Sequence, residues 1–245
     1  MDNLIIRFGK NEDTFLFPAG NKNTKEVIDW ILSTNKNLTF CSLVEEQVEF
    51  LKKNYPEKFE YFEDRAMSDY IYTTESLKTL TGKKLSSKRN HINRFVENNP
   101  DWSFEEICDS NLQEVIKMHD NWCKINNTNN EVSLTNEGYA VKIAINNYKK
   151  LNLSGGLIRA NGEVIAFSFG EKLNNTTFLV HIEKAYHHIQ GAYPMINKQF
   201  VIHFCDGFLF VDREEDTGDE GLRKAKLSYN PCNILRKFNA KVICD

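Results

Sequence analysis

The residues with the richest chemistry in this chain lie in one acidic segment and the basic helix behind it, at positions 211–231. An apolar run at 208–212 predicts a short buried strand that leads directly into the acids. These acids are Asp212, Glu214, Glu215, Asp216, Asp219 and Glu220. A helix is predicted at 219–227, where Arg223 and Lys226 lie three residues apart and share one face. Carboxylates after a strand and cations on the next helix indicate a polar site at a sheet edge.

An ordinary surface explains the same residues. Asp219 and Arg223 are four positions apart, so they can form an i,i+4 ion pair that leaves the other acids solvated. Thr217 and Glu220 have the spacing of a capping box, which predicts Thr217 as the helix cap. The residue types alone leave both interpretations open.

A second candidate lies where the predicted strand 176–183 leads into the predicted helix 193–205. Small residues at this join would let backbone N–H groups approach a ligand, and the first amides of the helix face the same place. These positions are Gln190, Gly191, Ala192 and Tyr193. Such a geometry suits a pyrophosphate or another anion. Glu183 ends the strand, where a carboxylate can act as a general base on an incoming amine.

A third candidate is basic. Residues 76–96 contain six cations and no acid. The cations are Lys78, Lys83, Lys84, Lys88, Arg89 and Arg94. On the predicted helix 81–98, Lys84, Lys88 and His91 share one face, and an apolar stripe runs along another. A solvated basic face is the ordinary explanation, but the lack of acids favours an anionic partner such as tRNA, a nucleotide or a lipid headgroup.

The whole chain is typical of a globular protein. It has 245 residues, 41% of them hydrophobic, and a net charge of −3, so any nucleic-acid contact must come from a local patch. Neither a run of about 20 apolar residues nor a secretory signal is found, which predicts a cytoplasmic protein without a transmembrane segment. The adjacent His187 and His188 predict a surface loop, and no metal site is expected. Six scattered cysteines are expected to be buried free thiols: Cys41, Cys108, Cys123, Cys205, Cys232 and Cys244.

The apolar spacing predicts an alternation of helices and strands. Helices are expected at 24–32, 45–54, 81–98, 111–126, 136–150, 193–205 and 219–227. Strands are expected at 4–8, 14–17, 38–43, 59–62, 70–72, 102–107, 153–159, 163–172, 176–183, 208–212 and 234–243. The first two of these strands are expected to form a hairpin. Asn161-Gly162 is a strong hairpin signal, so residues 153–183 are expected to form a three-stranded antiparallel meander.

From residue 102 onward, this order resembles that of the GNAT (acyl-CoA N-acyltransferase) fold. Several motifs also resemble the family named for the C-terminal domain of phosphatidylglycerol lysyltransferase. They are YIY at 70–72, GKK at 82–84, KRNHINRF at 88–95, HIEK at 181–184, GAY at 191–193, and REED at 213–216 with GLRKAKLSYNP at 221–231. The resemblance implies an α+β protein of tandem GNAT-like domains with mixed, mostly antiparallel sheets flanked by helices. The expected domains are 1–100, which is abbreviated, and 101–245.

Relatives of this family include Fem-type peptidyltransferases, which move an aminoacyl group from charged tRNA to an amine. The resemblance therefore implies direct attack of an amine or hydroxyl on an activated carbonyl, without a covalent enzyme intermediate. Glu183 or Asp216 would take the acceptor's proton, and Tyr229 would supply one to the leaving group. Arg223 and Lys226 would hold a phosphate or a developing negative charge. The nucleotide part of the donor would lie on Lys84, Lys88 and Arg89.

Two other functions fit the same sequence. A coenzyme A-dependent N-acyltransferase would bind its donor at residues 190–193, although the glycine-rich loop expected of such enzymes is thin here. A non-catalytic module would use the basic helix to hold RNA or anionic lipid, with an affinity that falls steeply with salt. The acceptor would be a small molecule, a peptide or a lipid.

Overall fold

The computed structural model describes residues 3–8, 13–20, 22–126 and 132–243. Contacts divide the chain into two compact units. One contains residues 1–70, 215–224 and 234–245, and the other contains residues 71–214 and 225–233. The first unit is therefore built from three separate segments of the chain. The domain boundary expected after residue 100 stays a prediction.

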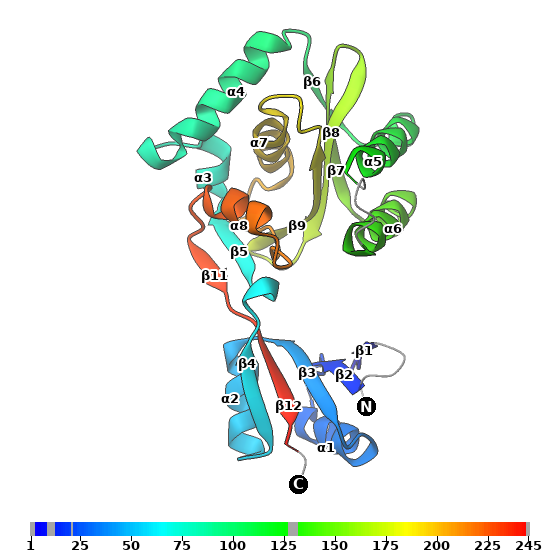
Figure 1. Ribbon diagram of the computed structural model, residues 1–245, viewed down its shortest axis with the longest axis vertical. Coiled ribbons are helices and arrows are strands. Elements are labelled where there is room, and N and C mark those ends of the chain that lie inside the picture. The colour runs from blue at the N-terminus through cyan, green and yellow to red at the C-terminus, as the bar shows by residue number, and fades with distance from the viewer. Residues whose placement is uncertain (1–2, 9–12, 21, 127–131, 244–245) are drawn as a thin grey trace. The chain divides into compact units, whose positions relative to one another are not determined.

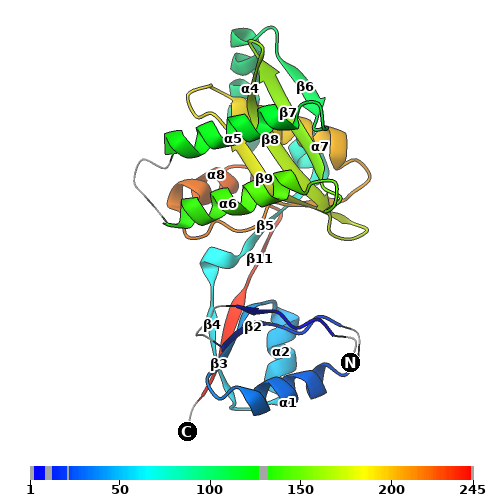
Figure 2. The same ribbon diagram turned by 90° about the vertical axis from the view of Figure 1, so that its right-hand side faces the viewer.

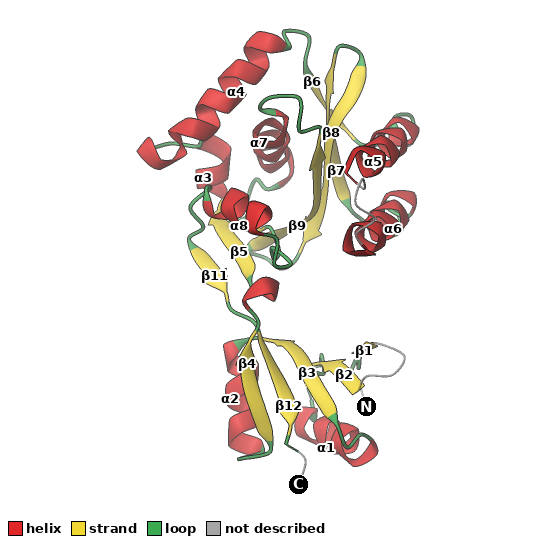
Figure 3. Ribbon diagram, viewed as in Figure 1, coloured by secondary structure: helices red, strands yellow, loops and turns green. Residues whose placement is uncertain are grey.

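The first unit is built on a mixed sheet whose strand order is β1-β2-β3-β12-β4 (Figure 1). Its strands are β1 (Arg7–Phe8), β2 (Asp13–Leu16), β3 (Leu38–Leu43), β4 (Phe59–Glu63) and β12 (Phe238–Val242). Its helices are α1 (Thr24–Thr34) and α2 (Glu45–Asn54). The C-terminal strand β12 lies between β3 and β4 and is antiparallel to both (Figure 3). Ile28, Ile31, Phe40 and Leu51 are fully buried in the core that results.

The second sheet has the strand order β11-β5-β10-β9-β8-β7-β6. Its strands are β5 (Asp69–Thr73), β6 (Ser103–Glu106), β7 (Ser154–Ala160), β8 (Glu163–Lys172), β9 (Thr177–Ala185), β10 (Phe210–Asp212) and β11 (Asn233–Leu235). The helices in this part of the chain are α3 (Thr74–Thr79), α4 (Ser86–Asn98), α5 (Leu112–Asn126), α6 (Val132–Asn146), α7 (Ala192–Phe204) and α8 (Glu220–Leu227). Helix α7 lies against one face of the sheet, and α5 and α6 cover the other (Figures 1 and 2).

The predicted meander is confirmed. Strands β7, β8 and β9 pair antiparallel in sequence order. Asn161 and Gly162 turn the first hairpin with φ of 51° and 76°, the left-handed backbone that this dipeptide favours. The inward side chains of the meander, such as Leu157, Phe167 and Phe169, are fully buried. The meander is therefore a rigid base for the residues at its end.

Strands β9 and β10 are joined through α7 and pair in parallel, as a crossover connection allows. Their pairing runs from Thr177 and Phe210 to Leu179 and Asp212. Beyond that point β9 continues to Ala185, while the chain leaves β10. The last residues of β9, including Glu183, consequently lie where the two strands part.

Three expected elements differ from the structure. The helix expected at 81–98 begins at Ser86, because a separate short helix, α3, and a 3-10 turn at Lys83–Leu85 precede it. The strand expected at 234–243 is two strands, β11 and β12, which belong to different sheets. Helix α6 also ends four residues earlier than expected, at Asn146.

The cysteines were expected to be buried, and this expectation was wrong for most of them. Of the described cysteines, Cys205 is buried, whereas Cys108 and Cys232 are exposed. Cys41 and Cys123 are partly exposed, and none of these five described cysteines forms a disulfide. Cys244 lies outside the described residues.

Candidate functional site

Glu183 is held at the parting of β9 and β10 by two donors. Arg213, the first residue after β10, donates from Nη2 to Oε1 of Glu183 at 2.9 Å. Asn197 of α7 donates from Nδ2 to Oε2 at 2.9 Å. The Glu183 side chain is 13% exposed and that of Arg213 is 10% exposed, so the ion pair is largely shielded from water. Each carboxylate oxygen accepts one of these bonds, and a carboxylate has about four acceptor positions, so capacity remains for a ligand.

Two tyrosines and a lysine surround this pair. The Arg213 guanidinium lies 4.8 Å from the ring centroid of Tyr229 and 5.6 Å from that of Tyr72. The Lys88 ammonium lies over the same Tyr229 ring, 4.1 Å from its centroid. Burial raises the pKa of Tyr229, so its phenol keeps its proton at neutral pH. Burial also lowers the pKa of Lys88, as does the nearby Arg213 charge, while Glu183 opposes them.

A pocket of about 350 Å³ opens beside Lys88 at the beginning of α7. It is lined by Lys88, His91, His187, His188, Ile189, Gln190, Gly191, Tyr193 and Pro194. Lys88 contributes a cation to this lining, and the N-terminal end of a helix carries partial positive charge. The pocket therefore suits an anionic group. Ala192, which was also expected here, is fully buried in the first turn of the helix.

Gly191 lets α7 begin close to α4. Its backbone has φ of 83°, and a Cβ at this position would lie 2.2 Å from the carbonyl oxygen of His91. It would also lie 2.8 Å from Cβ of Phe95. The glycine is thus required by both conformation and space.

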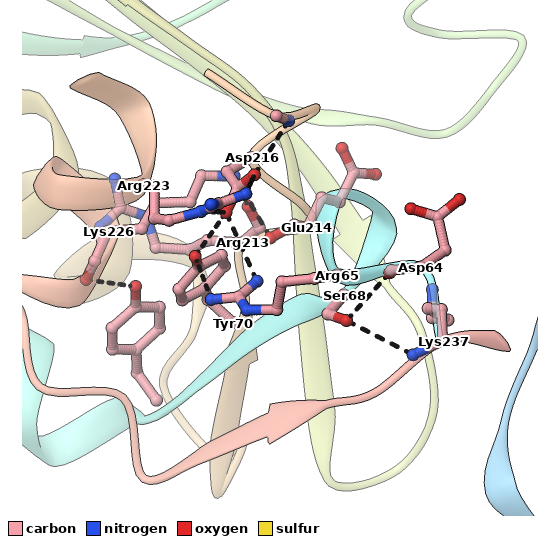
Figure 4. Close-up of polar contacts among 12 residues, drawn as sticks. Asp64, Arg65, Ser68, Tyr70, Arg213, Glu214, Asp216, Arg223, Lys226 and Lys237 are labelled. Carbon is pink, nitrogen blue, oxygen red and sulfur yellow. Dashed lines mark hydrogen bonds and ion pairs between the residues drawn. The ribbon is translucent and has the colours of Figure 1, made fainter. Parts of the chain in front are cut away.

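Asp216 is the centre of a separate cluster in the first unit (Figure 4). Its carboxylate is fully buried and accepts two hydrogen bonds from the Arg223 guanidinium, at 2.8 and 2.9 Å. It also accepts from the Tyr70 hydroxyl at 2.6 Å, the Gly218 N–H at 2.9 Å and Arg65 at 3.4 Å. Burial alone would raise the pKa of Asp216, but the bonds from Arg223, Tyr70 and Gly218 outweigh it and hold the pKa well below its usual range. Asp216 is therefore ionised at neutral pH and fully hydrogen-bonded, which makes it a poor proton acceptor.

The cations expected to bind phosphate have other partners. Arg223 holds Asp216, and the surface ion pair with Asp219 that was an alternative for it is replaced by this buried one. Lys226 is 8% exposed and donates to the backbone carbonyls of Arg213 at 2.6 Å and Glu214 at 3.2 Å. Arg89 donates to the carbonyls of Leu80 and Gly82. Arg223, Lys226 and Arg89 therefore stabilise the conformation of loops.

The expected capping residue also differs. The carboxylate of Asp219 accepts the N–H of Leu222 at 2.6 Å, which makes Asp219 the cap of α8. Thr217, which was expected to cap this helix, instead has a left-handed backbone with φ of 50°. Lys84 is exposed in the 3-10 turn before α4, so it does not share a helical face with Lys88.

His181 occupies an irregular position in β9, where the register with β8 shifts. Its Nδ1 contacts Glu214 at 2.7 Å and its Nε2 contacts Glu171 at 2.9 Å. Hydrogen bonds with Glu214 and Glu171 raise the pKa of His181 to about 9, against the opposing effect of burial. The His181 imidazolium therefore links Glu214, the residue after Arg213, to the sheet.

The sequence did not single out several of these residues. Arg213 lay inside the acidic segment but was given no role, and Asn197 was unremarked. Asn197 had a usable signal, because it is one amide within an otherwise apolar helical stretch, and a buried amide requires a partner. Tyr70 and Tyr72 stood in the YIY motif but were given no role, because the partners of their hydroxyls, Asp216 and Lys226, are about 150 residues away.

The fold is α+β, with two mixed, mostly antiparallel sheets that are flanked by helices. A family model described as the C-terminal domain of phosphatidylglycerol lysyltransferase matches residues 2–241. The chain belongs to this family.

Solved structures agree with this assignment. The chain is 39% identical to a conserved protein of unknown function from Bacteroides thetaiotaomicron, with a TM-score of 0.93 and coverage of 99% of this chain and 83% of that one. It shares its fold, at 13% identity, with the C-terminal domain of a putative lysylphosphatidylglycerol synthetase from Agrobacterium fabrum, with a TM-score of 0.68 and coverage of 98% and 83%. The L-PGS structure from Bacillus licheniformis is 15% identical, with a TM-score of 0.66 and coverage of 97% and 79%.

An uncharacterised protein of Mycoplasmoides gallisepticum is 26% identical over 207 residues. The match covers 81% of this chain and 63% of that protein, so the chain spans under two thirds of the relative's length.

Within the described residues, none of the helices combines the length and the apolar character that crossing a membrane requires. The same residues contain no cluster of three or more His, Cys, Asp or Glu side chains arranged to hold a metal ion.

Proposed function

We propose that this protein transfers an activated acyl group to an amine or hydroxyl acceptor by direct attack, with Glu183 at the reacting centre. The observation that carries the proposal is the position of Glu183. It lies at the parting of β9 and β10, next to Tyr229 and Lys88, and Lys88 also lines the pocket at the start of α7. A carboxylate, a protonated phenol and an anion pocket are the groups that such a transfer requires.

In this reaction the acceptor nitrogen or oxygen forms a bond to the carbonyl carbon, and the bond from that carbon to the leaving atom breaks. Glu183 takes the proton that the acceptor loses. Tyr229, whose ring packs against Arg213 and Lys88, gives a proton to the leaving oxygen or sulfur. Arg213 donates toward the developing negative charge, where a fixed donor contributes most.

The donor's anionic part binds in the pocket at Lys88, Gln190, Gly191 and Tyr193. Asp216, Arg223 and Lys226 act indirectly, because they order the loop that begins at Arg213. Arg89 orders the loop before α4 in the same way. Lys84 is exposed and would contact only a donor large enough to extend beyond the pocket.

We propose aminoacyl-tRNA as the donor, since the related family names refer to lysyl transfer and the region from α3 to α4 is rich in cations. Coenzyme A thioesters are the second candidate, because an anion pocket at a helix N-terminus also suits a pyrophosphate. A small molecule, a peptide or a lipid remains a candidate acceptor. A non-catalytic RNA- or lipid-binding module is the competing function from another class.

Thermal stabilisation by the candidate donors tests the donor site. A ligand that binds only the folded protein raises the melting temperature by mass action. We expect charged tRNA to stabilise the wild type and the effect to be lost in Lys88→Met but kept in Lys172→Met, a matched control on an exposed lysine at the end of β8. Stabilisation by coenzyme A alone would assign the second donor, and an equal loss in both variants would reject a specific role for Lys88.

A further inference from the structure

Two buried polar atoms beside Glu183 have no hydrogen-bond partner among the described residues. They are Oδ1 of Asn197 and Nη1 of Arg213. Asn197 is 1% exposed and the Arg213 side chain is 10% exposed. An unpaired buried polar group destabilises the folded protein, so its retention calls for a partner. Elsewhere in these two side chains, the polar atoms that bond do so to the same carboxylate.

The orientation of the Asn197 amide follows from its neighbour. Glu183 is an acceptor, so the amide atom that meets Oε2 at 2.9 Å is the NH₂ group. The carbonyl oxygen of Asn197 consequently points elsewhere. That oxygen and the remaining acceptor positions of Glu183 together attract a group with several N–H donors.

Arg213, in contrast to Asn197, needs a hydrogen-bond acceptor. Its Nη2 is bonded to Glu183, and Nη1, on the same guanidinium carbon, is a donor that lacks an acceptor. Both unpartnered atoms thus belong to side chains that are bonded to the Glu183 carboxylate. Oδ1 of Asn197 is an acceptor, and Nη1 of Arg213 is a donor. A ligand that satisfies both must carry N–H donors and an oxygen acceptor close together.

We infer that Asn197, Glu183 and Arg213 form a subsite for a primary ammonium group with a carbonyl-type oxygen nearby. The ammonium lies against Oδ1 of Asn197 and the Glu183 carboxylate, and the oxygen accepts from Nη1 of Arg213. A hydroxyl has one donor and cannot satisfy both acceptors, so the subsite selects an amine over an alcohol. The inference deepens the proposed function and rests on it for the role of Glu183, but it concerns binding and not turnover.

Calorimetric titration of the full chain with matched small probes tests the subsite. L-alaninamide presents the ammonium and the carbonyl, N-acetyl-L-alaninamide lacks the ammonium, L-lactamide has a hydroxyl in its place, and n-propylamine lacks the oxygen. We expect alaninamide to bind at least about 10-fold more tightly than each of the other three, the equivalent of about 1.4 kcal/mol. Equal binding of the acetylated or the hydroxy probe would overturn the ammonium site, and equal binding of propylamine would overturn the role of Arg213.

Variants supply a second measurement. Asn197→Leu removes the orphaned oxygen at similar volume and should weaken alaninamide binding about 10-fold, whereas Lys198→Ala, on the next residue of α7, should not. If Asn197→Leu fails to fold, the four probes on the wild type still decide. Finding only ordered water on Oδ1 and Nη1 in crystals soaked with alaninamide would overturn the inference.

A competition experiment decides whether the ammonium group that binds this subsite belongs to the donor or to the acceptor. Alaninamide that is displaced by a bound donor occupies the donor's aminoacyl position, and alaninamide that binds alongside the donor occupies the acceptor's position. Either result supports the subsite. Failure of the proposed function would instead be seen as probe binding without any acyl transfer.

Discussion

At the scale of single residues, the two carboxylates that the sequence marked as proton acceptors have different environments. Asp216 accepts bonds from Arg223, Tyr70, Gly218 and Arg65, and is fully buried. Glu183 accepts one bond on each oxygen. Each carboxylate lies beside an arginine, but only Glu183 has hydrogen-bond acceptor positions left for a ligand. A sequence cannot make this distinction, because the tyrosine and one of the arginines on Asp216 come from about 150 residues away.

Neutralising Asp216 should destabilise the folded protein. Asp216→Asn removes one partner of a buried ion pair, and we expect the free energy of unfolding at pH 7 to fall by about 2 kcal/mol. This lies below the usual 3–5 kcal/mol because Arg223 is one-third exposed. Urea unfolding measures the change. Asp219→Asn is the matched control, since asparagine keeps the cap of α8, and its effect should stay within about 0.5 kcal/mol.

The same pair makes a prediction about pH. The pKa of Asp216 is lowered in the folded state, so its stabilising contribution is present above the unfolded-state pKa of about 3.9 and is lost as pH falls below it. The stability gap between the wild type and Asp216→Asn should therefore be constant from pH 7 to about pH 5 and shrink below about pH 4. A gap that stays constant into acid would show that Asp216 is not held in its charged form.

At the scale of elements, the sequence predicted most of the second sheet and lost accuracy where partners are remote. The meander β7–β9 was predicted because Asn161-Gly162 and the alternating side chains are local signals. Residues 234–243 read as one apolar strand, since side-chain alternation carries no information about which sheet a strand joins. Helix α3 was missed because six polar-rich residues give little periodicity. Of the candidate site, the sequence marked Glu183 and Lys88 as expected site residues. It did not mark Asn197 and Arg213, whose contacts with Glu183 depend on the parting of β9 and β10.

The contact between α4 and α7 makes a prediction at this scale. In Gly191→Ala the new Cβ would meet the His91 carbonyl and the Phe95 side chain, in addition to the strain of a positive φ. We expect a loss of about 2 kcal/mol or more in the free energy of unfolding. Gly82→Ala is the control, because Gly82 has a similar φ of 85° but nothing within 4 Å of the added Cβ, so it should cost only about 1 kcal/mol. Equal costs would contradict the close packing at Gly191.

At the scale of the whole molecule, net charge gives no indication of a donor site. The chain carries a net charge of −3, yet Lys88, Arg213 and the beginning of α7 form a local concentration of positive charge. A local field of this kind is what selects an anionic ligand. The family match establishes the family of the protein, whereas the donor and acceptor that we propose rest on this one region of the second unit.

Acyl transfer by Glu183→Gln is the most direct test of the central claim. Labelled aminoacyl-tRNA and acyl-coenzyme A are each supplied with an amine acceptor, and the labelled product is counted for the wild type, for Glu183→Gln and for Glu163→Gln, a control on an exposed glutamate of β8. Loss of a general base costs typically 10²–10⁴-fold in rate, so we predict a fall of about this size in Glu183→Gln alone, with donor binding retained. Unchanged transfer by Glu183→Gln, or donor binding by the wild type without any transfer, would contradict the account.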